Sequence, residues 1–385
     1  MRCAGLAKMN VRVEGAAGNY DSFCHCLQIY NLPSFLSIAC TERNLSVSCQ
    51  LLVVSCLLYN RLMHVLVVGS SVIDLFLNLD SDHYKIQDQK VLLELGDKIP
   101  SSIKKTAMGG NGANTSVGLT RLETPTTFYT YLGDDFFSRE IQEGLSREGV
   151  DLDVERHNET NSAVHVVLDF PQDRVILTNY SKNPHGFSPK IKTFDFLFLT
   201  TIPDFWEEAY RKTLEFASEN NIQVAFSPGT RQIEDKNDLV IEVVRNSKIY
   251  FSNKEEAIRV SGVKYSVKSR EDMKKLLLDM KKMGPEVVSI TDGLHGAYAI
   301  DREYNCFYII AAPTKGTEKT GAGDAYATGF FANYILGGDT QASMLWGALN
   351  AGNVMEHVGA QKGLLTHKRL DEEIKTHNNL KAEKI

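Results

Sequence analysis

Two glycine-rich loops carry the residues whose types and spacing could do chemistry. Gly109-Gly110-Asn111-Gly112-Ala113-Asn114 and Thr320-Gly321-Ala322-Gly323-Asp324 each open a predicted helix. A helix N-terminus with glycines presents free backbone N–H groups and the positive end of the helix dipole, which suits the oxygens of a transferring phosphoryl group. Asp324 beside the second loop could accept the proton of an attacking hydroxyl. Alternatively, Asp324 only caps its helix, and the first loop only allows close helix–sheet packing.

Several other signatures of nucleotide and hydrolytic enzymes are absent from the sequence. There is no GxxxxGK[ST] motif, and the first predicted strand is followed by Gly69 alone rather than by GxGxxG. HExxH, GxSxG and the kinase HRD and DFG motifs are also missing. A Walker-A protein and a hydride-transferring Rossmann enzyme are therefore both disfavoured.

The elements that must position the two loops alternate between strands and helices along residues 63–385. Strands are predicted at 64–69, 126–131, 163–169, 174–178, 194–199, 223–226, 248–252, 287–291, 297–300 and 306–311. Helices are predicted at 114–122, 136–148, 205–219, 271–283, 325–334 and 342–357. This alternation indicates an α/β fold with a mostly parallel sheet covered on both faces, which binds ligands at the carboxyl ends of its strands. Residues 75–107 break the alternation and favour a small β excursion.

Composition narrows the classes of partner. The 385 residues include 42 Lys and Arg against 48 Asp and Glu, a net charge of −6, with 43% hydrophobic and 23% charged residues. This mild acidity disfavours a nucleic-acid binder and a polybasic membrane anchor. We therefore expect neither nucleic-acid nor membrane partners.

Residues 1–62 differ in composition from the remainder. They hold six of the seven cysteines: Cys3, Cys24, Cys26, Cys40, Cys49 and Cys56. The segment could be a targeting or anchoring segment, although its apolar stretch at 45–59 is too short to span a membrane. Cys24-His25-Cys26 could belong to a metal or disulfide module. We favour a third interpretation, in which Met63 is the real start and residues 1–62 are an extension outside the fold.

Residues 63–385 are poor in cysteine, which fits a reducing, cytoplasmic location.

Taken in order, the loops and other motifs resemble the ribokinase-like, or PfkB-type, carbohydrate kinases. Asn253-Lys254-Glu255-Glu256 resembles the NxxE element of that family, and Thr291-Asp292-Gly293-Leu294-His295-Gly296 resembles its TxGxxG loop. Gly133-Asp134-Asp135 and Glu148-Gly149-Val150-Asp151 also fit. The resemblance covers residues 63 to about 370. It implies a ribokinase-like three-layer α/β/α fold with a mostly parallel central sheet, plus a small β lid at 75–107 that could pair in a homodimer.

The same resemblance implies a role for each matching residue. The general base and the anion hole would be Asp324, Gly321, Ala322 and Gly323. The sugar would be bound by Asp74, Gly110 and Asn114. ATP would be bordered by Thr291, Gly293 and Gly296. Mg²⁺ would be organised through water by Asn253 and Glu256, which could alternatively form a simple helix cap.

The expected activity is ATP-dependent phosphorylation of a sugar hydroxyl. One alternative is a nucleoside kinase of the same family, and another is a catalytically silent sugar-binding protein, which the retained Asp324 disfavours. Glu318 stands where the family usually has Asp, so activation by K⁺ stays open. Val72 and Asn111 also depart from ribose kinases, so the sequence leaves the sugar open.

Overall fold

The computed structural model of the protein describes residues 63–157, 161–171, 173–179, 185–191, 193–203, 205–235, 238–316 and 320–385. The three interpretations of residues 1–62 lie outside this part of the chain. Glu318, on which the K⁺ prediction depends, also lies outside the described residues.

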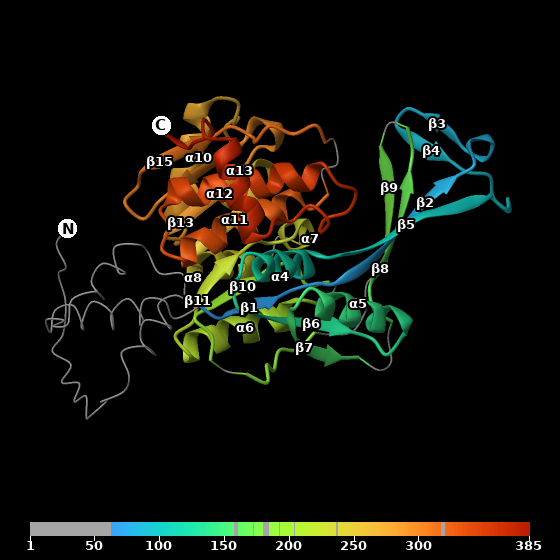
Figure 1. Ribbon diagram of the computed structural model, residues 1–385, viewed down its shortest axis with the longest axis horizontal. Coiled ribbons are helices and arrows are strands. Elements are labelled where there is room, and N and C mark those ends of the chain that lie inside the picture. The colour runs from blue at the N-terminus through green and yellow to red at the C-terminus, as the bar shows by residue number, and fades with distance from the viewer. Residues whose placement is uncertain are drawn as a thin grey trace, which may run out of the picture. The chain divides into compact units, whose positions relative to one another are not determined.

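A ten-stranded sheet forms the centre of the described residues (Figure 1). Its order is β16-β15-β14-β13-β12-β11-β10-β1-β6-β7, and the strands from β13 to β7 pair in parallel. The strands are β1 (Val65–Val68), β6 (Thr126–Leu132), β7 (Asp151–Arg156), β10 (Phe196–Leu199), β11 (Gln223–Phe226), β12 (Ile249–Asn253), β13 (Val287–Thr291), β14 (Ala297–Ile300), β15 (Cys306–Ile309) and β16 (Glu383–Lys384). The run Val-Leu-Val-Val of β1 is buried throughout, as expected for a parallel strand covered on both faces.

Helices cover both faces of this sheet. Along β1, Val65 and Val67 pack into one hydrophobic core while Leu66 and Val68 pack into another, because successive side chains of a strand point to opposite faces. The first core includes side chains of α4 (Asn111–Arg121), α5 (Phe136–Arg147), α11 (Ala322–Ile335), α12 (Thr340–Met355) and α13 (His367–Thr376). The second includes side chains of α6 (Glu207–Glu219), α7 (Thr230–Glu234), α8 (Asp238–Asn246), α9 (Lys254–Ser261) and α10 (Arg270–Lys282). The three-layer α/β/α prediction is confirmed.

A second sheet of four strands stands out from the main sheet on the side of α4 and α5 (Figure 1). Its order is β5-β2-β8-β9. It is built from β2 (Val72–Leu79), β5 (Ser101–Gly109), β8 (Val164–Asp169) and β9 (Arg174–Asn179), and β3 (Lys85–Gln87) and β4 (Lys90–Leu92) pair beside it. We call this sheet the lid. The excursion predicted at 75–107 supplies only part of it, because β8 and β9 join from a later segment.

The local sequence pattern predicted most of the strands and helices of the main sheet but missed several. The strand β7 and the helices α7, α8, α9 and α13 were not predicted, and α4 and α11 begin at Asn111 and Ala322, a few residues before the predicted starts. Within the described ranges, no helix combines the length and the apolar character needed to cross a membrane.

Candidate active site

Polar residues at the carboxyl ends of adjacent parallel strands line a row of cavities. Ser70, Thr201 and Ser227 lie just past β1, β10 and β11. Asn253 and Thr291 are the last residues of β12 and β13. The site therefore lies at the edge of the sheet that the predicted topology indicated.

Three cavities of about 360, 480 and 320 Å³ follow one another along this edge. Asp74, Gly110 and Asn114 border the first, and Asn253 and Glu256 border the second. The third is bordered by Thr291, Gly293 and Gly296. Gly323 borders all three cavities and Asp324 borders the first two, so the predicted base lies at the junction.

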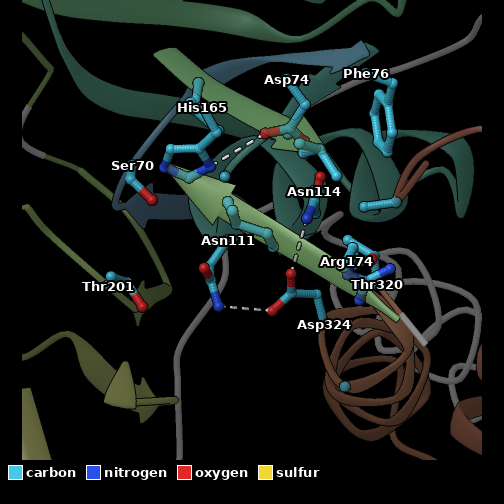
Figure 2. A pocket seen from close by; sticks show the side chains of 18 residues that line it. Ser70, Asp74, Phe76, Asn111, Asn114, His165, Arg174, Thr201, Thr320 and Asp324 are labelled. Carbon is cyan, nitrogen blue, oxygen red and sulfur yellow. Dashed lines mark hydrogen bonds and ion pairs between the residues drawn. The ribbon is translucent and has the colours of Figure 1, made fainter. Parts of the chain in front are cut away.

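Asp324 lies in the first turn of α11 and is held by two side-chain amides from α4. Asn111 Nδ2 donates to Asp324 Oδ1 at 3.0 Å, and Asn114 Nδ2 donates to Asp324 Oδ2 at 2.8 Å (Figure 2). Burial raises the pKa of Asp324 to about 6, and the negative charge of Glu256 adds to this rise, while the two amides oppose it. The carboxyl is thus a base at neutral pH. The alternative that Asp324 caps the helix is wrong, because Gly321 is the N-cap and no side chain caps it.

Gly321 and Gly323 shape the N-terminus of α11 in different ways. Gly321 has φ +77, and a Cβ there would lie 2.4 Å from the Cβ of Ala360, so the backbone conformation and the close packing both require glycine. A Cβ on Gly323 would meet nothing within 4 Å. The first residues of α11 leave their backbone N–H groups without partners in the helix, which makes them available to an anion.

Gly110 brings the first loop close to β1. It is the N-cap of α4 with φ +94, and a Cβ there would lie 2.6 Å from the carbonyl oxygen of Ser70. This close packing places Asn111 and Asn114 of α4 beside Asp324. The first glycine loop therefore serves to position the two side-chain amides.

Asp74 projects from the lid strand β2 into the first cavity. Its side chain is buried, and Oδ1 lies 3.1 Å from Nδ1 of His165 on β8 (Figure 2). The parallel register of β2 and β8 places these two residues directly opposite each other.

The sequence analysis missed the lid residues that line the first cavity. Besides His165, these are Phe76, Val167, Arg174 and Ile176. Their period-two spacing on β2, β8 and β9 is the signal that could have indicated a shared face.

Asn253 and Glu256 form a capping box at the start of α9. Asn253 Oδ1 accepts from the Glu256 backbone N–H at 2.8 Å, and Glu256 Oε2 accepts from the Asn253 N–H at 3.0 Å. The capping interpretation is therefore confirmed. Because both residues also border the second cavity, capping does not remove them from the site. Burial raises the pKa of Glu256, although its hydrogen bonds oppose the shift.

The residues of the second cavity fit a hydrated Mg²⁺ better than a caged metal. Among the residues that the structure describes, no three His, Cys, Asp or Glu side chains are grouped so as to hold a metal ion. Mg²⁺ usually keeps several waters and uses one or two carboxylates together with phosphate oxygens. Glu256 supplies such a carboxylate at a cavity that Asp324 also borders.

The third cavity combines the TxGxxG loop with apolar walls. Gly296 has φ +98, and a Cβ there would lie 2.0 Å from the carbonyl oxygen of Ile309. Lys254 forms an ion pair with Asp292, which fastens this loop to the start of α9. The apolar lining includes Leu294, Ile309, Ile310, Ala348 and Met355.

A family model and curated relatives match the described chain. The model of the pfkB family carbohydrate kinases matches residues 63–367. A nucleoside kinase of Methanocaldococcus jannaschii is 25% identical over 291 residues, which cover 73% of this chain and 89% of the relative. A 5-dehydro-2-deoxygluconokinase of Clostridium perfringens is 25% identical over 293 residues, which cover 70% of this chain and 84% of the relative.

Solved structures share the fold. The ribokinase of Arabidopsis thaliana, complexed with ribose and ATP, superimposes with a TM-score of 0.70 at 21% identity, covering 81% of this chain and 99% of that structure. The Methanocaldococcus jannaschii nucleoside kinase superimposes with a TM-score of 0.65 at 20% identity, covering 82% and 99%.

Proposed function

The chain belongs to the pfkB family of carbohydrate kinases, which are phosphotransferases with an alcohol group as acceptor, and on this premise we propose that it transfers the γ-phosphoryl group of ATP to a sugar hydroxyl. The observation that carries the proposal is the position of Asp324. Asp324 borders the first cavity, where Asp74 offers carboxylate oxygens to a polar acceptor, and also the second cavity, which Thr291 of the TxGxxG loop lines as well.

The chemistry follows from these positions. An acceptor hydroxyl in the first cavity approaches Asp324, which takes its proton as the new O–P bond forms and the bond between the γ-phosphorus and the bridging oxygen of ATP breaks. The free N–H groups at the start of α11 stabilise the charge of the transferring group. ADP leaves with the bridging oxygen, and the proton passes from Asp324 to solvent.

Each remaining part of the site has a proposed partner. Asp74 binds sugar hydroxyls, with Gly110 and Asn114 completing the wall. The apolar third cavity takes the adenine of ATP beside Thr291, Gly293 and Gly296. Mg²⁺ on Asn253 and Glu256, held through water, would neutralise phosphate charge when bound.

A nucleoside is the second candidate acceptor. Phe76, Val167 and Ile176 give the lid side of the first cavity an apolar wall, which would suit a base better than a bare sugar. The similarity of this chain to the nucleoside kinases of Methanocaldococcus jannaschii and Methanothermobacter thermautotrophicus supports this candidate.

An ADP-release screen tests both candidates. It would cover pentoses, hexoses, sugar acids, sugar phosphates and nucleosides, with and without Mg²⁺ and K⁺, and Asp324→Asn would control for ATP hydrolysis. We expect acceptor-dependent ADP release that needs Mg²⁺ and is lost in the variant. Binding of sugars without any acceptor-dependent release would support the silent sugar-binding alternative instead.

The lid supports the proposal of a homodimer. Together with residues 90–95 beside it, the lid exposes several large apolar side chains: Leu92, Leu93, Leu95, Ile103, Ile176 and Leu177. Large apolar side chains exposed in this number are candidates for burial against a second copy of the chain. Sedimentation of the wild type and of Ile103→Lys would test it, with a shift of the variant to the monomer as the expected result.

A cytoplasmic location likewise stays a prediction, supported by the cysteine-poor composition of residues 63–385.

A further inference from the structure

The amide of Asn114 makes two side-chain contacts that only one orientation allows. Its Nδ2 donates to Asp324 Oδ2 at 2.8 Å, and its Oδ1 accepts from Gln361 Nε2 at 3.1 Å. If the amide turned over, its carbonyl oxygen would face the carboxylate and its NH₂ group would face another NH₂ group. The Nε2 group of Gln361 therefore keeps the NH₂ group of Asn114 directed at the carboxylate of Asp324.

Gln361 is itself held in place by the backbone around it. It is buried, and Arg121 Nη1 donates to the carbonyl oxygens of Gln361 at 2.7 Å and of Leu364 at 2.9 Å. The residue before Leu364 is held as well, because Asn353 Nδ2 donates to the carbonyl oxygen of Gly363 at 2.6 Å. The loop is thus fixed to both α4 and α12.

Arg121 is in turn fixed by Glu148. The guanidinium makes two contacts with this carboxylate, Nε to Oε2 and Nη2 to Oε1, both at 2.8 Å. Paired contacts of this kind set the direction of the guanidinium as well as its position. Glu148 opens the Glu148-Gly149-Val150-Asp151 motif, to which the active site assigns no role.

We propose that Gln361 is a positioning residue for the transfer step, which holds the Asn114 amide in the orientation that donates to Asp324, with Glu148 and Arg121 fixing the loop that carries it. The inference rests on the proposed function, since Asp324 acts there as the base. It adds to that function a residue 247 positions from Asn114 in the sequence, which contacts Asn114 but does not itself border the first cavity.

The physical reason is that Asn114 stabilises the charged form of Asp324. A hydrogen bond donated to a carboxylate lowers its pKa, and Asn114 is the larger of the two amide contributions at Asp324. Other charged or titratable side chains around the first two cavities are Asp74, His165, Arg174, Arg231, Glu234, Glu256 and Tyr326. Substitution of Gln361 changes none of these groups.

The test is the pH dependence of kcat for Gln361→Met, which removes the donor without adding charge. We expect the acid limb to move up by roughly one pH unit, the scale of one charge-assisted hydrogen bond. At pH 6 the variant should then be about fivefold slower than the wild type relative to their rates at pH 9. The KM for ATP should stay unchanged, because the third cavity is untouched.

A second variant and a matched control keep the result specific. Gln361→Glu is isosteric, but it places a carboxylate oxygen opposite Oδ1 of Asn114, where Gln361 has a donor. The acid limb of this variant should therefore move further than that of Gln361→Met. Gln341→Met also removes one amide hydrogen bond, from Nε2 to the carbonyl oxygen of Ala382 at 2.9 Å, but neither residue borders the two cavities beside Asp324. Its pH profile should match the wild type.

Two outcomes would overturn the inference. One is an activity loss of the same factor at every pH, which would mean that Gln361 is only structural. The other is an unchanged profile in both Gln361 variants. A ¹³C titration of the Asp324 carboxyl, assigned by comparison with Asp324→Asn, measures the same shift without any assay. It therefore decides the inference even if no acceptor is phosphorylated and the proposed function fails.

Discussion

Asn114 on α4 and Asp324 on α11 lie 2.8 Å apart from amide nitrogen to carboxylate oxygen, although 210 residues separate them in the sequence. The contact joins the two glycine loops into one site. It also explains why the first loop needs an amide at its end. Without hydrogen-bond donors, a buried carboxyl group would stay protonated up to a higher pH, and less of it would be available as a base near neutral pH.

Asp324→Asn should lower turnover by about 10²–10⁴-fold, the range for loss of a positioned proton acceptor. The side chain keeps its size, so the KM values for ATP and acceptor should change little, because the base acts mainly in the transition state. Steady-state kinetics on the acceptor found in the screen measure this. Turnover above a third of the wild-type value would refute the base assignment.

The raised pKa of Asp324 predicts how the stability of the fold depends on pH. The pKa is about 6 in the fold against 3.8 ordinarily, so the folded protein binds the proton more tightly than the unfolded chain does. The contribution of Asp324 to the free energy of unfolding therefore becomes less favourable as pH rises from about 4 to 6. Asp324→Asn should melt at a higher temperature than the wild type at pH 8, and the difference should vanish near pH 3. Equal melting temperatures at pH 8 would show that Asp324 is well solvated.

Asp74→Ala should raise the KM for the acceptor far more than the KM for ATP. Each charge-assisted hydrogen bond from a carboxylate to a sugar hydroxyl contributes about 1.5–3 kcal/mol. The control is Asp169→Ala on the same lid, where Asp169 Oδ2 pairs with Lys104 Nζ at 2.8 Å on the surface. That variant should leave both constants near wild type. An equal rise of both KM values in Asp74→Ala would mean that Asp74 only supports the lid.

Alanine at the two glycines of α11 should separate folding from catalysis. Gly323→Ala adds a methyl group with nothing within 4 Å, so stability should be kept or raised by about 0.5–1 kcal/mol. The methyl group would nevertheless stand at the junction of the three cavities, and kcat should fall. Gly321→Ala forces a Cβ to within 2.4 Å of Ala360 at φ +77, so it should lower the melting temperature. An active Gly323→Ala would place phosphoryl transfer elsewhere.

A chain that begins at Met63 should fold and phosphorylate as well as the full sequence. The family match begins at residue 63, and the first core strand begins at Val65. The sequence of residues 1–62 has no sustained helical or strand period, so it offers no amphipathic face for docking. Thermal unfolding and kcat of the two chains measure this. A melting temperature several degrees lower for the shorter chain would show that the segment contributes to the fold.

The sequence by itself determined whatever depends on neighbours along the chain. Alternating apolar runs and amphipathic stretches predicted the layers, because the periods of strands and helices are local properties. Asn253 and Glu256 showed their capping box for the same reason, since their spacing of three residues is enough. Gly321 and Asp324 could be placed at the start of one helix from the sequence of a single loop.

Only the tertiary structure decided which distant residues meet. The contact between Asp74 and His165 depends on the register of β2 against β8, and a shift of one residue would turn His165 to the other face of the lid. The contact between Gln361 and Asn114 depends on how a loop fixed by Arg121 packs beside α4. No local period encodes either contact, because each is set by the packing of segments that the sequence keeps far apart.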